Sequence, residues 1–221
     1  MRVLITGTSR GTGKAAAEKF LSLGHEVHGI DLNGACIQHP NYRHYQVDIR
    51  REEALPDIDG VEILFNNAGV QQGEDDIATN LSGAIRVTEK YIARNPALKS
   101  ILFNASASSV SGQEFPHYVA SKAGLVGYMR NVAIRTAPAG VTCNAISLGG
   151  VLTDSNDAVM DDPGMWKAIL DVTPMKKWTT LDEVCEWVAF LTLVNRSMSG
   201  ENLLIDNGEK DLNPTFVWPG Y

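Results

Sequence analysis

The chain has 221 residues, a length that fits a single α/β domain. Hydrophobic residues make up 44% of it and charged residues 20%, and the absence of any apolar run of membrane-spanning length predicts a protein that does not cross a membrane. The net charge of -7 and the lack of a Lys/Arg-rich run argue against nucleic acid as a partner.

Short apolar runs rich in Val, Ile and Leu alternate with longer stretches of helical spacing. Residues 14–24 form one such stretch and end on Gly24, and residues 117–138 form another that Pro138 stops. Strands that alternate with helices form βαβ units, which indicates a mostly parallel sheet. The strands are predicted at residues 3–7, 26–32, 45–49, 61–69, 100–106, 141–148 and 201–208.

Two segments differ from this pattern. Residues 33–41, between the second and third predicted strands, are fewer than a parallel crossover usually takes, so no firm helix is predicted there. Residues 150–180 are irregular, with Gly, Asp, Asn and Pro around one short amphipathic piece at 165–170, and we expect them to form a lid over a substrate. No repeat or linker marks a second domain, so residues 1–221 are predicted to form one.

The stretch TGTSRGTG, from Thr6 to Gly13, follows the first predicted strand directly. A Gly-rich turn that opens a helix can hold a pyrophosphate on backbone N–H groups, although a plain flexible turn needs no ligand. Asp31 ends the next strand at about the offset, roughly 20 residues, at which an acid binds the adenine-ribose hydroxyls. A carboxylate there repels a 2′-phosphate and favours NAD over NADP, whereas Arg10 could pair with that phosphate. A solvated acid at a strand end is the alternative for Asp31.

Tyr118 and Lys122 lie four residues apart on a predicted helix, so both side chains share one face. A phenol has a pKa near 10, and a neighbouring ammonium lowers it by stabilising the phenolate. The pair can therefore donate and accept a proton. The alternative is that Tyr118 and Lys122 share a helix face and have no catalytic role.

Taken together, TGTSRGTG, NNAG at Asn66–Gly69, TNLSG around Asn80, YVASK, CNAISLGG and IDNG resemble, in order and context, the short-chain dehydrogenase/reductase family. The resemblance covers essentially the whole chain. It implies a Rossmann-type, doubly wound, mostly parallel seven-stranded sheet with helices on both faces.

The resemblance also implies a path for a dinucleotide from the pyrophosphate turn to the nicotinamide. Asp31 matches the ribose acid, Asp48 the acid near the adenine, and Asn67 the segment beside the cofactor; a simple strand-end Asx turn is the alternative for Asn67. The implied cofactor-binding residues are Gly7, Ser9, Arg10, Gly11, Thr12, Gly13, Asp31, Asp48, Ile49, Asn67, Ala68, Gly69, Tyr118, Lys122, Gly149, Val151 and Thr153.

For the catalytic residues, the resemblance makes Tyr118 the general acid/base, with Lys122 tuning that phenol and holding the nicotinamide ribose. Asn80 matches the residue that bends its helix and holds a water, although an Asn on a helix often only bonds local backbone. The catalytic serine is open among Ser106, Ser108, Ser109 and Ser111. Ser106 is preferred because it ends a predicted strand, Ser108 is second, and anchoring on Gly112 would select Ser109.

Two positions differ from the family pattern. Leu148 replaces the Pro of the usual Pro-Gly before the nicotinamide-contacting stretch, which puts the local rigidity in doubt. The span from NNAG to Asn80 is also shorter than usual, which trims one wall of the cleft.

The implied activity is NAD-dependent hydride transfer between the nicotinamide and a small-molecule ketone or secondary alcohol. Within the family, the resemblance favours carbonyl reductases or hydroxysteroid dehydrogenases. Alternatives are an NADP-dependent 3-oxoacyl-carrier-protein reductase and a catalytically silent NAD(H)-binding sensor. A methyltransferase shares the Gly-rich turn but has no use for NNAG or YxxxK.

Partners and location are further expectations. The family commonly pairs through the helices that bear Asn80 and Tyr118, which implies a homodimer or homotetramer, and the aromatic tail 213–221 is predicted to dock on a neighbour or cap the cleft. Three widely spaced cysteines suggest neither disulfides nor a metal site. With no secretory-type segment, we expect a cytoplasmic protein.

Overall fold

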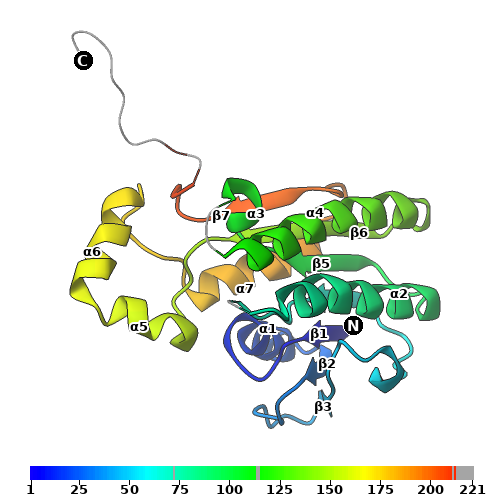
Figure 1. Ribbon diagram of the computed structural model, residues 1–221. Coiled ribbons are helices and arrows are strands. Elements are labelled where there is room, and N and C mark those ends of the chain that lie inside the picture. Colours follow the sequence, from blue (N-terminus) through cyan, green and yellow to red (C-terminus); the bar gives the residue numbers. More distant parts are fainter. Residues whose placement is uncertain (72, 113–114, 211, 213–221) are drawn as a thin grey trace.

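The protein is described by a computed structural model, which places residues 1–71, 73–112, 115–210 and 212 (Figure 1). These residues contain one seven-stranded parallel sheet with the order β3-β2-β1-β4-β5-β6-β7. The strands are β1 (Arg2–Thr6), β2 (Glu26–Asp31), β3 (Tyr42–Gln46), β4 (Ile63–Asn66), β5 (Ser100–Asn104), β6 (Thr142–Leu148) and β7 (Asn202–Ile205). The parallel, doubly wound α/β fold expected from the sequence is confirmed.

The helices form a layer on each face of the sheet (Figure 1). The main ones are α1 (Gly11–Ser22), α2 (Ala84–Arg94), α3 (Ser108–Ser111), α4 (Pro116–Thr136), α5 (Asp157–Met160), α6 (Pro163–Val172) and α7 (Leu181–Ala189). Short 3-10 turns are η1 (Glu52–Ala54), η3 (Ala137–Ala139) and η4 (Asp154–Asn156), and π-helical segments are η2 (Ile77–Gly83) and η5 (Phe190–Val194).

Two apolar cores, one on each side of the sheet, hold these layers together. On one side α2 and α4 pack Tyr91, Leu125 and Met129 onto the strands. On the other side α1 and α7 pack side chains such as Phe20 and Val188. The central strands are therefore buried on both faces, which is why β1, β4 and β5 read as mostly continuous apolar runs, whereas the edge strand β3 is only partly buried.

The third strand was predicted at 45–49, and this range is wrong by three residues. In the structure Tyr42 begins the strand by pairing with Val27, and Val47 lies past its end. The Tyr42 hydroxyl is hydrogen bonded to the Thr8 hydroxyl at 2.9 Å, which fixes that end of β3 against the first turn. Asp48 and Ile49 therefore lie in the loop after the strand. The connection at 32–41 contains no regular helix, in line with its short length.

The region at 150–180 is more helical than predicted, with η4, α5 and α6 in place of a single short piece. Asp162 explains the start of α6, because its carboxylate accepts hydrogen bonds from the N–H groups of Gly164 and Met165. Figure 1 shows α5 and α6 at one end of the molecule, apart from the two helical layers.

Within the residues that the structure places, no helix is both long and apolar enough to cross a bilayer.

Candidate active site

A crevice lies at the carboxyl ends of the neighbouring strands β1 and β4, where the strand order reverses direction. This is the position at which doubly wound sheets bind ligands. Two adjoining pockets form it: one of about 370 Å³, here called the Asp31 pocket, and one of about 650 Å³, here called the Tyr118 pocket. They share the lining residues Arg10, Thr12, Asn67, Gly69, Val70, Asn104, Thr153 and Ser155, so they form one continuous crevice.

The Gly-rich turn brings the amino end of α1 to the floor of this crevice. Gly13 packs so closely on the turn that a Cβ there would lie 1.9 Å from the carbonyl oxygen of Gly7. Only glycine fits, and the backbone N–H groups that open α1 are held at the crevice as a site for an anionic group. This geometry fits the pyrophosphate of a dinucleotide.

Asp31 ends β2 inside the Asp31 pocket and is only 8% exposed. Its Oδ2 accepts a hydrogen bond from the Ser9 N–H at 2.9 Å, and its Oδ1 accepts from the Asn33 N–H at 2.8 Å. The carboxylate is therefore held in place between the turn after β1 and the turn after β2. It is not a solvated strand-end acid.

Asp48 also lines the Asp31 pocket, but its carboxylate is already engaged. Arg50 binds it through Nε, at 3.0 Å from both oxygens, and through Nη2 at 2.8 Å from Oδ2. This guanidinium lowers the pKa of Asp48 and also pairs with Asp75 at 2.8 Å. A purine amino group that approaches Asp48 would therefore compete with Arg50.

The NNAG segment joins three strands at the crevice floor. Asn67 donates through Nδ2 to the carbonyl oxygens of Thr6 and Gly7 at 3.0 and 3.2 Å, and its Oδ1 accepts from Asn104 Nδ2 at 2.9 Å. The N–H groups of Asn67 and Ala68 both donate to the Thr6 hydroxyl at 3.0 Å. Asn67 thus stitches the ends of β1, β4 and β5 together, which is more than a local Asx turn does.

Tyr118 and Lys122 extend from α4 into the Tyr118 pocket. Lys122 Nζ lies 5.6 Å from the centre of the Tyr118 ring and donates to the Asn104 carbonyl at 2.8 Å. Burial lowers the pKa of Lys122 to about 8, with the charge of Asp76 acting in the opposite direction. The ammonium is therefore close to the phenol and poised to titrate near neutrality.

The serine hydroxyls that follow β5 lie in different surroundings. Ser106 lines the Tyr118 pocket, and its Oγ accepts from the Ser108 hydroxyl at 2.8 Å and from the Ser108 N–H at 3.2 Å. Ser108 is completely buried, and Ser109 is hydrogen bonded to Ser147 on β6 at 3.1 Å. Of these three serines, Ser106 lies at the crevice and Ser108 orients it.

Asn80 sits in the π-helical segment η2, so the helix is irregular where the sequence predicted a bend. Its side chain bonds both the N–H and the carbonyl of Val70 at 2.8 Å and donates to the Ser121 hydroxyl at 3.0 Å. Asn80 therefore ties the loop after β4 to α4 directly beside Lys122.

Leu148 and Gly149 stand where the family pattern has Pro-Gly, and Trp178 packs on the next residue, Gly150. A Cβ at Gly150 would lie 2.0 Å from Trp178 Cε2. Trp178 lines the Tyr118 pocket and packs edge-to-face against Trp166 of α6, with the two ring centres 5.1 Å apart. Trp178 therefore forms an aromatic wall near the end of β6, and the bridge between Val151 and Thr179 holds the residue next to it in place.

Most residues predicted for the site line the crevice, namely Gly7, Arg10, Gly11, Thr12, Asp31, Asp48, Ile49, Asn67, Ala68, Gly69, Ser106, Tyr118, Lys122, Gly149, Val151 and Thr153. Ser9, Gly13 and Asn80 lie behind the lining and support it through the contacts given above. Within residues 150–180, Trp178 lines the crevice, whereas Met165 is 56% exposed. The predicted role of residues 213–221 falls outside the described residues.

Sequence reasoning missed Asn104, Thr6, Arg50 and Gly150. Asn104 ends β5, contacts both Asn67 and Lys122, and has an Oδ1 with no hydrogen-bond partner among the placed residues. Its position as a polar residue at the end of an apolar strand was the signal that could have found it. Thr6, Arg50 and Gly150 act through contacts with Ala68, Asp75 and Trp178, which lie far from them in the sequence.

Comparison with known proteins gives matches along nearly the whole chain. The family model described as enoyl-(acyl carrier protein) reductase matches residues 7–210. (+)-Borneol dehydrogenase 1 of Salvia officinalis is 32% identical over 96% of this chain and 94% of its own.

Two solved structures share the fold. A 4-hydroxyisoleucine dehydrogenase complexed with NADH superposes with a TM-score of 0.86 at 21% identity, covering 96% of this chain and 99% of its own. A putative 2-deoxy-D-gluconate 3-dehydrogenase from Agrobacterium tumefaciens with bound NADP gives 0.84 at 24% identity, covering 94% of this chain and 95% of that one.

Proposed function

Because the chain belongs to the short-chain dehydrogenase/reductase family and is an oxidoreductase acting on CH–OH or C=O groups, we propose that it is an NAD(H)-dependent enzyme for a ketone and its secondary alcohol. The observation that carries the proposal is the grouping of Tyr118, Lys122 and Ser106 in one pocket, next to a pocket that contains Asp31. A nicotinamide cofactor bound along the crevice supplies or accepts the hydride.

The proton chemistry falls to the chain's own residues. Ser106 Oγ accepts two hydrogen bonds from Ser108, which leaves its own proton to donate to a carbonyl oxygen. Tyr118 gives the proton to that oxygen during reduction and takes it back during oxidation. Lys122, positively charged and 5.6 Å from the ring centre, stabilises the phenolate form.

The choice of NAD over NADP rests on Asp31. Its buried carboxylate is fixed by two backbone N–H groups and cannot turn away, so a 2′-phosphate placed beside it would meet a like charge. Ribose hydroxyls, by contrast, can donate to it. Arg10 favours NADP, since it is exposed and lines both pockets. An NADP-dependent reductase of acyl-carrier-protein thioesters is therefore the second candidate.

The proposal also includes the expected substrate class, domain organisation, oligomeric state, location and lid. The substrate is a small molecule, the chain forms one domain, and two or four copies associate through the helices that bear Asn80 and Tyr118. We place the protein in the cytoplasm, and residues 150–180 act as the substrate lid.

The direct test is turnover of a panel of linear ketones, cyclic ketones and steroids, followed through the nicotinamide absorbance with NADH and with NADPH. We expect consumption of NADH with at least one class and a lower kcat/KM with NADPH. A higher kcat/KM with NADPH would transfer support to the second candidate. Tight NADH binding without turnover across the panel would identify a sensor.

A further inference from the structure

The loop between β4 and η2 buries a carboxylate that the proposed mechanism does not use. Asp76 is 0% exposed and lies immediately before η2. Its Oδ1 accepts from the Gly73 N–H at 3.2 Å, while its Oδ2 has no hydrogen-bond partner among the described residues. A buried, incompletely bonded carboxylate destabilises the fold unless a positive charge compensates it.

Lys122 is a buried cation that also lacks some of its hydrogen-bond partners among the described residues. It is 4% exposed, and its Nζ makes one hydrogen bond to a described residue, although an ammonium has three donors. A Cβ on Gly69 would lie 3.4 Å from Lys122 Nζ and 3.2 Å from Asn80 Oδ1, so both side chains lie against Gly69. Asp76 is one helical turn before Asn80, which places its charge in the same buried region.

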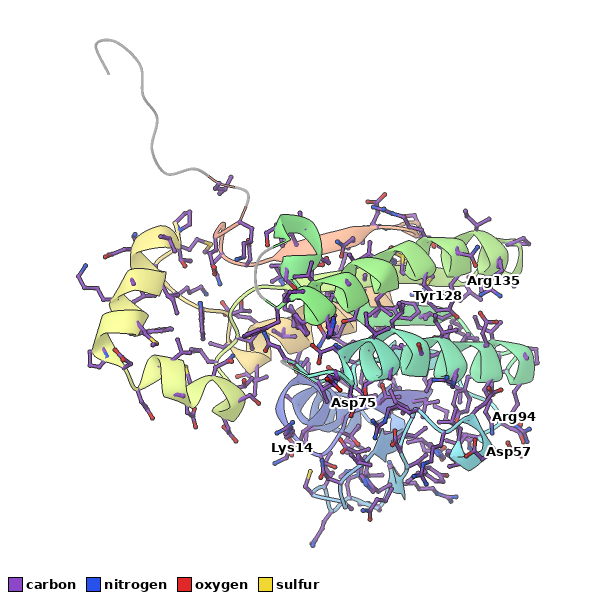
Figure 2. All side chains as sticks on the ribbon, viewed as in Figure 1. Lys14, Asp57, Asp75, Arg94, Tyr128 and Arg135 are labelled. Carbon is purple, nitrogen blue, oxygen red and sulfur yellow. The ribbon has the colours of Figure 1, made fainter. Side chains whose placement is uncertain are left out.

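The charge of Asp76 acts on Lys122 in the direction that this placement requires. Burial lowers the pKa of the ammonium to about 8, and Asp76 raises it. The neighbouring Asp75 is not equivalent, because it is exposed and paired with Arg50. Figure 2 shows Asp75 near one end of the α2 helix and Arg94 near the other end. The other titratable groups that line the Tyr118 pocket are Arg10, Tyr118, Glu209 and Lys210.

We infer that Asp76 is a positioning residue whose buried negative charge keeps Lys122 protonated, so that the Tyr118–Lys122 pair works at neutral pH. A neutral amine could not stabilise the phenolate, and a buried ammonium without a counter-charge would lose its proton. The inference rests on the proposed function for its consequence in catalysis. The charge state of Lys122 is measurable without it.

The catalytic test compares pH profiles of ketone reduction by NADH for the wild type, Asp76→Asn and Glu74→Gln. Glu74 is an exposed carboxylate on the same loop and outside the crevice lining, which makes it the matched control. In Asp76→Asn we expect the alkaline limb of kcat/KM to move to lower pH by about one unit, because removal of a nearby opposite charge shifts a pKa by about that much. Glu74→Gln should keep the wild-type limb. Equal limbs in all three proteins would overturn the inference.

A second readout does not need turnover. Lysine labelled with ¹³C at Cε is incorporated, the Lys122 signal is assigned by its loss in Lys122→Met, and its pKa is read by NMR titration. We expect a pKa near 8 in the wild type, as burial and Asp76 together set it, and a lower value in Asp76→Asn.

The two readouts separate the possible failures. A wild type that reduces no ketone would contradict the proposed function, and the titration would still decide the role of Asp76. If Asp76→Asn does not fold, Asp76→Ser removes the same charge with a smaller side chain. An unchanged Lys122 pKa in the folded variant would show that Asp76 is only structural.

Discussion

A single phenol proton carries the proposed acid–base step, and it belongs to Tyr118. Tyr118→Phe removes the hydroxyl and keeps the ring, so we expect turnover to fall by ~10²–10⁴ while NADH binding persists. Steady-state kinetics and a fluorescence titration measure the two effects. Tyr128→Phe is the control, because Tyr128 lies farther along α4 and donates to Glu89 (Figure 2). Retention of more than about a tenth of the activity in Tyr118→Phe would refute the role.

The three serines after β5 provide a graded prediction at the same scale. Ser106→Ala removes the hydroxyl at the crevice and should lower kcat by about 10², as the loss of an oriented donor does. Ser108→Ala should cost less, because it only frees Ser106 to rotate, and Ser109→Ala should leave kcat unchanged. Kinetics of the three variants would exclude Ser106 if Ser108→Ala or Ser109→Ala were the most damaging.

How far the residues could be foreseen depends on what determines each one. Gly13, Asp31 and Lys122 follow from local spacing, because a turn, a strand end and a helix face each place a side chain without help from distant residues. The ion pair between Asp48 and Arg50 could not be predicted in this way. The sequence does not show whether the Asp48 carboxylate binds a ligand or Arg50. Asp76 was hidden because nothing in a linear sequence shows burial.

The positions of the predicted strands and long helices agree with the structure. The errors lie at the ends of elements, where tertiary contacts determine which residue begins or ends the strand or helix. β3 begins at Tyr42 because its hydroxyl reaches Thr8, a contact 34 residues back along the chain. Residues 163–172 are helical because Asp162 caps α6 and because Trp166 packs against Trp178. Periodicity over a few residues contains neither fact.

The contact between Gly150 and Trp178 gives a prediction at this scale. Gly150→Ala places a methyl group 2.0 Å from the indole and should destabilise the protein by about 1–3 kcal/mol, the usual cost of overpacking. Combining it with Trp178→Leu should recover part of that loss, because the smaller side chain leaves room. Urea unfolding of both single variants and the double variant measures the coupling. Strict additivity of the two single effects would contradict the packing described here.

For the whole molecule, the buried ammonium of Lys122 links stability to pH. Its pKa is about 8 in the folded protein and 10.5 when unperturbed, so between these values the unfolded chain holds a proton that the folded chain has released. Stability therefore rises with pH across this window. Measured against Lys122→Met, which lacks the group, the wild-type free energy of unfolding should gain about 3 kcal/mol from pH 8 to pH 10.5. A flat difference across the window, in urea melts, would show that Lys122 is not buried as described.

In the proposed function, the residues of the crevice assist the transfer of a hydride between a nicotinamide and a carbonyl carbon. The most direct measurement is isotope transfer, in which NADH deuterated at C4 is incubated with the best ketone of the panel and the alcohol is analysed by mass spectrometry. We predict one deuterium on the carbinol carbon from one of the two C4-labelled isomers of NADH, and none from the other. Bound but unconsumed NADH, or an alcohol free of deuterium with both isomers, would contradict the proposed function.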